Sequence, residues 1–174
     1  MSIEYPAEAS GPFPAPPRSI DDAAGREIHL RQAESADRES LVEMYRAFDP
    51  ADRAQGIPPC RESDIREWLA SITERDTRAV VALHESRPVG HGMLVADSEG
   101  GYELALFVLQ AYQGAGIGTA LLETLLGLGA ETGVERVWLT VERWNDPAIA
   151  VYEKVGFERT DDSGFELEMA MRLD

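Results

Sequence analysis

The chain has 174 residues, 44% of them hydrophobic, which is enough for one well-packed domain and short for two. Its 32 acidic and 16 basic residues give a net charge of −16, which argues against a nucleic-acid partner because a polyanion would be repelled. No apolar stretch reaches the roughly 20 residues of a membrane-spanning helix, and the N-terminus lacks a signal-peptide pattern, so we expect a cytoplasmic protein with no membrane partner.

The first part of the chain is rich in proline. Residues 1 to about 25 hold five of the ten prolines and show no apolar periodicity. This composition predicts a disordered or extended tail, followed by one domain over residues 26–174. The domain is expected to start with a short strand over residues 28–31.

Two helices are expected next. Ser35 is placed to cap the first helix, whose apolar residues recur at helical spacing up to Phe48. The second helix is predicted over residues 62–74, with apolar residues on one face. Residues 51–61, which include a glycine and two prolines, are expected to form an irregular loop between the helices.

Three strand-like runs follow, over residues 78–83, 89–96 and 102–109. Ser-Arg-Pro and Asp-Ser-Glu-Gly-Gly, which separate them, are typical of hairpin turns. Links this short predict an antiparallel meander.

A glycine-rich turn then joins the third strand to a helix expected over residues 117–131. Gly114, Gly116 and Gly118 let the backbone approach a ligand closely and adopt conformations closed to residues with a Cβ. The positive end of the helix dipole adds to the attraction for an anion. We therefore expect a phosphate or pyrophosphate group here, although a tight turn with close helix packing would also explain the glycines.

The last third of the chain alternates strands and helices. Gly133 is expected to end the helix, and the strand over residues 137–142 should pair parallel to the strand before the glycines because a crossover helix connects them. A short helix over residues 146–155 and a final strand pair complete the domain. The second member of that pair, residues 165–173, could pair across a homodimer if it is exposed.

Two residue counts bear on environment and chemistry. Lys154 is the only lysine, and an acidic excess with so little lysine resembles the composition of proteins from extreme halophiles. Cys60 is the only cysteine, so no internal disulfide can form, and no cysteine or histidine pair has metal-ligand spacing. We therefore expect a protein adapted to high salt, with no metal.

The order of these elements, together with the motifs over residues 113–118 and 145–157, resembles that of the GNAT superfamily of acyl-CoA-dependent N-acyltransferases. Gln113-Gly-Ala-Gly-Ile-Gly118 resembles the family's Gln/Arg-x-x-Gly-x-Gly/Ala pyrophosphate loop, and the segment from Asn145 to Phe157 is similar to its Asn-x-x-Ala-x-x-x-Tyr-x-x-x-Gly-Phe block. Two motifs at the right separation are more specific than either alone. The resemblance implies an α/β (α+β) fold with helices on both faces of a mixed, mostly antiparallel twisted sheet of six or seven strands, and a parallel central pair splayed at the acyl-CoA site.

The resemblance also implies acetyl-CoA as cosubstrate. Backbone groups near Val108 would hold the pantetheine arm and the thioester carbonyl, and Asn145 would hydrogen-bond the same arm or simply cap the helix that follows. Arg143 would add a salt contact to the cofactor or remain a solvated surface residue. The pyrophosphate would be bound by Gln113, Gly114, Gly116, Ile117, Gly118 and Thr119.

The implied reaction is direct attack of a primary amine on acetyl-CoA in a ternary complex. Tyr152 matches the family tyrosine that donates a proton to, or hydrogen-bonds, the CoA sulfur, although it could instead be a packed aromatic residue. Glu103 is the leading candidate for the general base and could equally be a surface charge. His91 is the second candidate, with a structural role as its alternative.

Some alternatives remain open at this stage. A Rossmann-type dinucleotide enzyme shares the glycine pattern, but three strands precede the turn and only 56 residues follow Gly118. A non-catalytic acyl-CoA-binding module is the other rival. The acceptor amine, whether small molecule, amino acid, peptide or protein, is undetermined: Arg46, Arg53 and Arg61 would favour an acidic group on it, while the many carboxylates would attract a cationic one.

Overall fold

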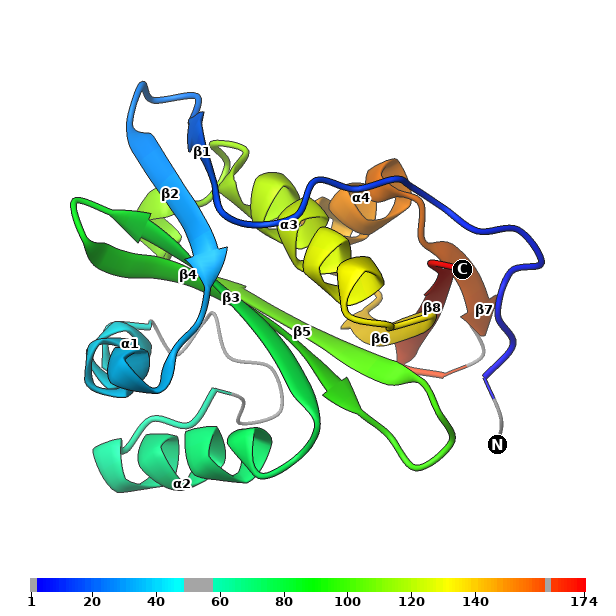
Figure 1. The fold of residues 1–174 in the computed structure, drawn as a ribbon, viewed down its shortest axis with the longest axis horizontal. Helices are drawn as coiled ribbons and strands as arrows, with labels where there is room; N and C mark the ends of the chain where they lie inside the picture. Colours follow the sequence, from blue (N-terminus) through cyan, green and yellow to red (C-terminus); the bar gives the residue numbers. More distant parts are fainter. Residues whose placement is uncertain (1–2, 49–57, 162–163) are drawn as a thin grey trace.

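The computed structural model describes residues 3–48, 58–161 and 164–174, and within them one eight-stranded sheet has helices on both faces (Figure 1). The strand order is β1-β2-β3-β4-β5-β6-β8-β7. The strands are β1 (Arg18–Asp21), β2 (Glu27–Gln32), β3 (Thr77–His84), β4 (Arg87–Ala96), β5 (Tyr102–Val108), β6 (Arg136–Glu142), β7 (Glu158–Asp161) and β8 (Glu166–Arg172). The helices are α1 (Arg38–Arg46), α2 (Glu62–Thr73), α3 (Ile117–Glu131) and α4 (Asp146–Val155), with short 3-10 turns η1 (Ser35–Asp37) and η3 (Gln110–Tyr112).

Alternation along β3 explains why the sheet carries a helical layer on each side. Successive strand residues point to opposite faces. Val81 and Leu83 are buried in a cluster with apolar residues of α1 and α2, whereas Val80 and Ala82 are buried with those of α3. The predicted fold class is therefore confirmed, with eight strands in place of the expected six or seven.

The parallel central pair is also confirmed, and its contact is short. β5 and β6 are in register only at Tyr102 with Val137 and at Glu103 with Trp138. Both strands continue for several residues beyond these pairs, to Val108 in β5 and Glu142 in β6, without pairing to each other. The sheet is therefore open between the C-terminal halves of these two strands.

The strand that sequence reasoning missed is β1, which lies within the proline-rich segment. β1 pairs antiparallel with β2, so ordered sheet begins before residue 26. Further upstream, the Ser10 amide donates to the Arg172 carbonyl at 2.8 Å, and Gly127 of α3 faces Pro14. The described part of this segment is extended and lies against α3 and β8 (Figure 1).

Two local expectations were wrong. Ser35 does not cap the first helix, because it lies inside η1. At this point of the chain the Asp37 carboxylate accepts a hydrogen bond from the Glu34 amide at 2.7 Å. The final strand β8 is not exposed, because it lies between β6 and β7 and pairs with both. The short β7 forms that edge of the sheet.

Two further observations bear on the expected partners. Among the described residues, no helix combines the length and the apolar character needed to cross a bilayer, and no group of three or more histidine, cysteine, aspartate or glutamate side chains could hold a metal ion. Residues 51–57 of the expected loop lie outside the described residues.

Candidate functional site

The glycine turn adopts the backbone conformations that its sequence predicted. Gly114 has φ 74° and Gly116, which caps the start of α3, has φ 90°. A Cβ at either position would meet no atom within 4 Å, so the positive φ rather than crowding calls for glycine. No side chain in the described part of the chain caps the first amides of α3. These amides are therefore available to bind an anion.

The turn is supported from outside by the hairpin between β1 and β2. The Ala23 amide donates to the Ala115 carbonyl at 2.9 Å, and the Arg26 guanidinium lies 4.2 Å from the centre of the Tyr112 ring. The Asp22 carboxylate forms an ion pair with the Arg26 guanidinium at 2.7 Å. Sequence reasoning missed this support, because contacts between segments about 90 residues apart leave no local pattern.

The Val108 amide points into the open part of the sheet. The Leu109 amide donates to the Val89 carbonyl at 2.9 Å, on the β4 side. Because backbone groups of successive strand residues point to opposite sides, the Val108 amide faces away from β4, toward β6. β6 does not pair with β5 at this level. The Val108 carbonyl accepts a hydrogen bond from the Gln113 side chain at 2.9 Å, and this bond links the end of the strand to the glycine turn.

Tyr152 lies on α4, half-buried, with its ring 5.9 Å from that of Phe157. Removal from water raises the pKa of its hydroxyl to about 12. No residue that the structure describes hydrogen-bonds this hydroxyl. Tyr152 is therefore protonated at neutral pH and able to donate a hydrogen bond.

The two polar residues after β6 have structural partners. The Asn145 side chain accepts a hydrogen bond from the Ala148 amide at 3.4 Å and so caps α4, which is one of the two roles expected from the sequence. Arg143 donates to the Gly164 carbonyl at 2.5 Å and so ties the end of β6 to the turn between β7 and β8. Neither contact excludes a second contact with a ligand.

Glu103 is not close to the Val108 amide. It lies at the start of β5, five residues before Val108, which is roughly 17 Å along an extended strand. Partial desolvation raises the pKa of its carboxyl, with Arg75 opposing this effect, although the side chain is exposed. Glu103 and Val108 therefore sit at opposite ends of the strand.

His91 lies closer to the open end of β5, on β4 opposite Phe107. It is 4% exposed, and its Nδ1 lies 2.7 Å from the Tyr45 hydroxyl. Burial lowers its pKa to about 4, only partly offset by the charge of Asp37. His91 is therefore neutral at physiological pH.

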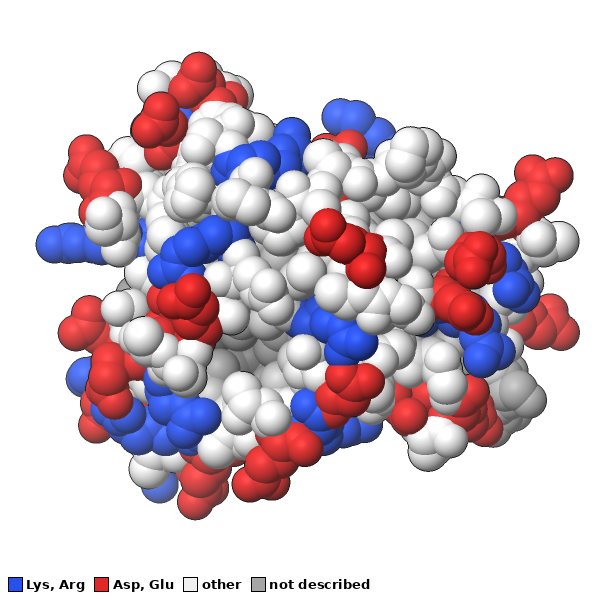
Figure 2. Space-filling view, viewed as in Figure 1, with Lys and Arg blue, Asp and Glu red and all other residues white. Residues whose placement is uncertain are grey.

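Surface charge alone would not attract a polyanion to this molecule. Figure 2 shows acidic and basic side chains interspersed on one face, with carboxylates around much of its outline, and the chain as a whole is strongly acidic. Fixed backbone dipoles at the start of α3 therefore have to supply the local attraction for an anion.

Comparison with known proteins identifies relatives over most of the chain. The model of a family described as "Acetyltransferase (GNAT) family" matches residues 38–157. An N-alpha-acetyltransferase from Sulfurisphaera tokodaii is 41% identical over 137 residues, covering 77% of this chain and 82% of that protein. An uncharacterized N-acetyltransferase from Mycobacterium tuberculosis is 34% identical over 97 residues, or 55% of this chain. This match spans 62% of that relative's length.

Solved structures share the fold at lower identity. The GNAT domain of S. lividans PAT has a TM-score of 0.76 and 18% identity, covering 90% of this chain and 97% of that one. PaiA N-acetyltransferase from Thermoplasma acidophilum, in complex with coenzyme A, has a TM-score of 0.66 and 22% identity, covering 83% of this chain and 98% of that one. These likenesses show the fold.

Proposed function

Because the chain belongs to the GNAT acetyltransferase family, we propose that it transfers an acetyl group from acetyl-CoA to a primary amine by direct attack in a ternary complex. The observation that carries the proposal is the uncapped start of α3, tied by Gln113 to the end of β5 where the sheet is open. Among the described residues, an uncapped helix start and a strand amide that pairs with no strand thus lie at the two ends of one short connection.

These groups fit the two ends of acetyl-CoA. The pyrophosphate would rest on the amides that follow Gln113, namely those of Gly114, Gly116, Ile117, Gly118 and Thr119. The space beside Gly114 and Gly116, where a Cβ would meet no protein atom, leaves room for phosphate oxygens. The pantetheine arm would lie in the open part of the sheet, with the Asn145 side chain at its edge. When bound, acetyl-CoA supplies an activated acetyl group.

Two groups of this chain would then assist the transfer. The Val108 amide would donate to the thioester oxygen and stabilise negative charge there as the amine attacks. The protonated hydroxyl of Tyr152 would donate to the departing sulfur. Positioned proton donors of this kind typically contribute about 10²- to 10⁴-fold to rate.

The attacking amine must lose a proton, and Glu103 is the proposed acceptor. Its raised pKa suits this role. Its distance along β5 from Val108 means that the proton would travel through water. Replacement by glutamine should then remove the acidic limb of the pH–rate profile, and an unchanged limb would show that Glu103 is a surface charge.

Ligand binding and catalysis can be tested separately. A thermal-shift panel in high salt should show stabilisation by acetyl-CoA and CoA, and stabilisation by NAD alone would contradict the proposal. A screen with radiolabelled acetyl-CoA across amines, amino acids and peptides should then reveal the acceptor. Binding of acetyl-CoA with no acetylation of any acceptor would instead favour the non-catalytic module.

A further inference from the structure

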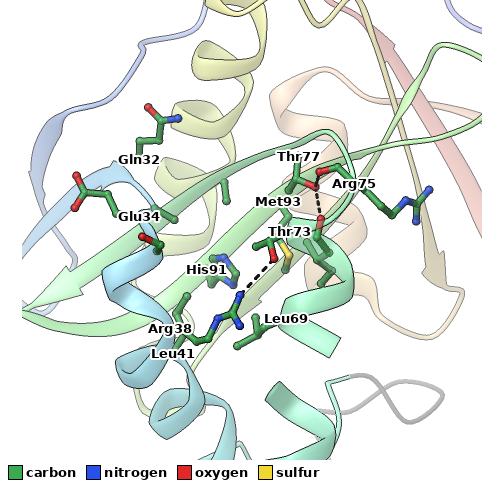
Figure 3. A pocket seen from close by; sticks show the side chains of 14 residues that line it. Gln32, Glu34, Arg38, Leu41, Leu69, Thr73, Arg75, Thr77, His91 and Met93 are labelled. Carbon is green, nitrogen blue, oxygen red and sulfur yellow. Dashed lines mark hydrogen bonds between the residues drawn. The ribbon is translucent and has the colours of Figure 1, made fainter. Parts of the chain in front are cut away.

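A pocket of about 360 Å³ opens between α1, α2 and the sheet, within the size range of sites for small molecules (Figure 3). Arg38, at the start of α1, lines it, whereas Phe48, just beyond the end of α1, packs against Phe107 near the end of β5. The pocket thus opens at the end of α1 away from Phe48, and it reaches inward to His91, which is paired with Phe107. His91, the second candidate for the general base, lines it, but no residue proposed to bind acetyl-CoA does.

The base of the pocket contains a buried nitrogen to which no described residue forms a hydrogen bond. His91 lines the pocket, and its Nδ1 is hydrogen-bonded to the Tyr45 hydroxyl. The Tyr45 hydroxyl can donate to Nδ1 or accept from it, and we take the tautomer in which it donates, which leaves the ring proton on Nε2. In this tautomer the ring N–H is 4% exposed as part of His91 and has no described hydrogen-bond acceptor. A buried N–H of this kind costs free energy unless a ligand or water accepts from it.

A cation that forms no ion pair with a described carboxylate, although its charge acts on Glu39, lies at the mouth of the same pocket. The Arg38 side chain extends from α1 toward Thr73 of α2, where its only hydrogen bond with a described residue measures 3.4 Å (Figure 3). No carboxylate in the described ranges forms an ion pair with Arg38. The nearby Asp37 is already paired with Arg31 at 2.7 Å, and Glu34 at the rim points away from His91 (Figure 3).

The remaining wall is mixed, with polar residues such as Gln32, Glu34 and Arg75 beside apolar ones. Leu41 of α1, Leu69 of α2 and Met93 of β4 line the space around His91. These side chains favour a ligand body that gains by leaving water. Two groups suited to an anion therefore lie beside a surface suited to hydrocarbon.

We propose that this pocket binds a small carboxylate with an apolar body. The carboxylate accepts from His91 Nε2 and from the Arg38 guanidinium, and the hydrocarbon packs on Leu41, Leu69 and Met93. No residue proposed for acetyl-CoA lines this pocket, and the inference does not rest on the proposed acetyl transfer.

The test compares 4-methylpentanoate with 4-methylpentanamide, which has nearly the same shape and no charge. Calorimetric titration at constant ionic strength should show the acid binding about tenfold more tightly than the amide, because charge-assisted hydrogen bonds are the stronger kind. Arg38→Gln should remove this preference. Arg38 is exposed, so the variant should fold normally. The matched control, Arg87→Gln, changes another exposed arginine outside the pocket and should keep the preference.

A second readout identifies the site directly. The chain has only three histidines, so their ring signals can be followed together by NMR during titration with the acid. The His91 signals should shift, and those of His29 and His84, which do not line the pocket, should stay in place. Equal affinity for acid and amide, an unchanged preference in Arg38→Gln, or an unmoved His91 signal would each overturn the proposal. Neither measurement uses acetyl-CoA, so failure of acetyl transfer would leave these results unaffected.

Discussion

Replacing His91 with glutamine should change how the stability of the fold depends on pH. In the folded chain burial lowers the pKa of His91 to about 4, whereas an unfolded histidine titrates near 6.5. Between these values the unfolded state binds a proton that the folded state does not. The contribution of neutral His91 to the free energy of unfolding is therefore fully present above about pH 6.5 and is lost as the pH falls toward 4.

The expected size follows from the two pKa values. Between pH 7.5 and 4.5 the wild type should lose about 2.5 kcal/mol more unfolding free energy than His91→Gln does. Urea unfolding at several pH values measures both curves, and losses from the carboxylates are common to both proteins. His29→Gln, at an exposed strand position, is the control and should keep the wild-type slope. Parallel curves for wild type and His91→Gln would refute the idea that His91 is buried in its neutral form.

Three further substitutions test other parts of the structure. Tyr152→Phe should keep acetyl-CoA affinity while lowering turnover at least about a hundredfold, and unchanged turnover would remove Tyr152 from the catalytic residues. Gly116→Val should abolish stabilisation by acetyl-CoA in a thermal-shift assay, since a branched side chain at φ 90° is strained and fills the space proposed for phosphate. Gly127→Ala should expose residues near Pro14 to limited proteolysis, because the added Cβ would collide with the Pro14 backbone. An unaltered digestion pattern would mean that this segment is not held against α3.

Elements with strong apolar periodicity could be predicted closely from the sequence. The helix expected over residues 117–131 matches α3, and the three-strand meander is present with ends shifted by a few residues. Local pattern suffices there because each element buries one face. β1 has four residues, two of them charged, and is held by pairing with β2, so its sequence shows no such pattern.

In the candidate site, too, features set by local sequence could be predicted, whereas features set by distant contacts could not. The positive φ angles of Gly114 and Gly116 follow from residue type, because glycine adopts such conformations at little cost. The stacking of Arg26 on Tyr112 and the pocket beside His91 depend on how distant segments pack. Sequence reasoning placed His91 on a strand and left its role open, since burial and the bond to Tyr45 decide its charge.

The short contact between β5 and β6 has a mechanical consequence. Two residue pairs join the half-sheet β1 to β5 to the half-sheet formed by β6, β8 and β7. The core beneath α3 includes buried residues from both halves, such as Leu94 of β4 and Leu139 of β6. The volume of these side chains therefore acts as a spacer between the halves. Enlarging or trimming them would change the width of the open seam, and with it the fit of the proposed thioester, without altering any residue proposed to touch it.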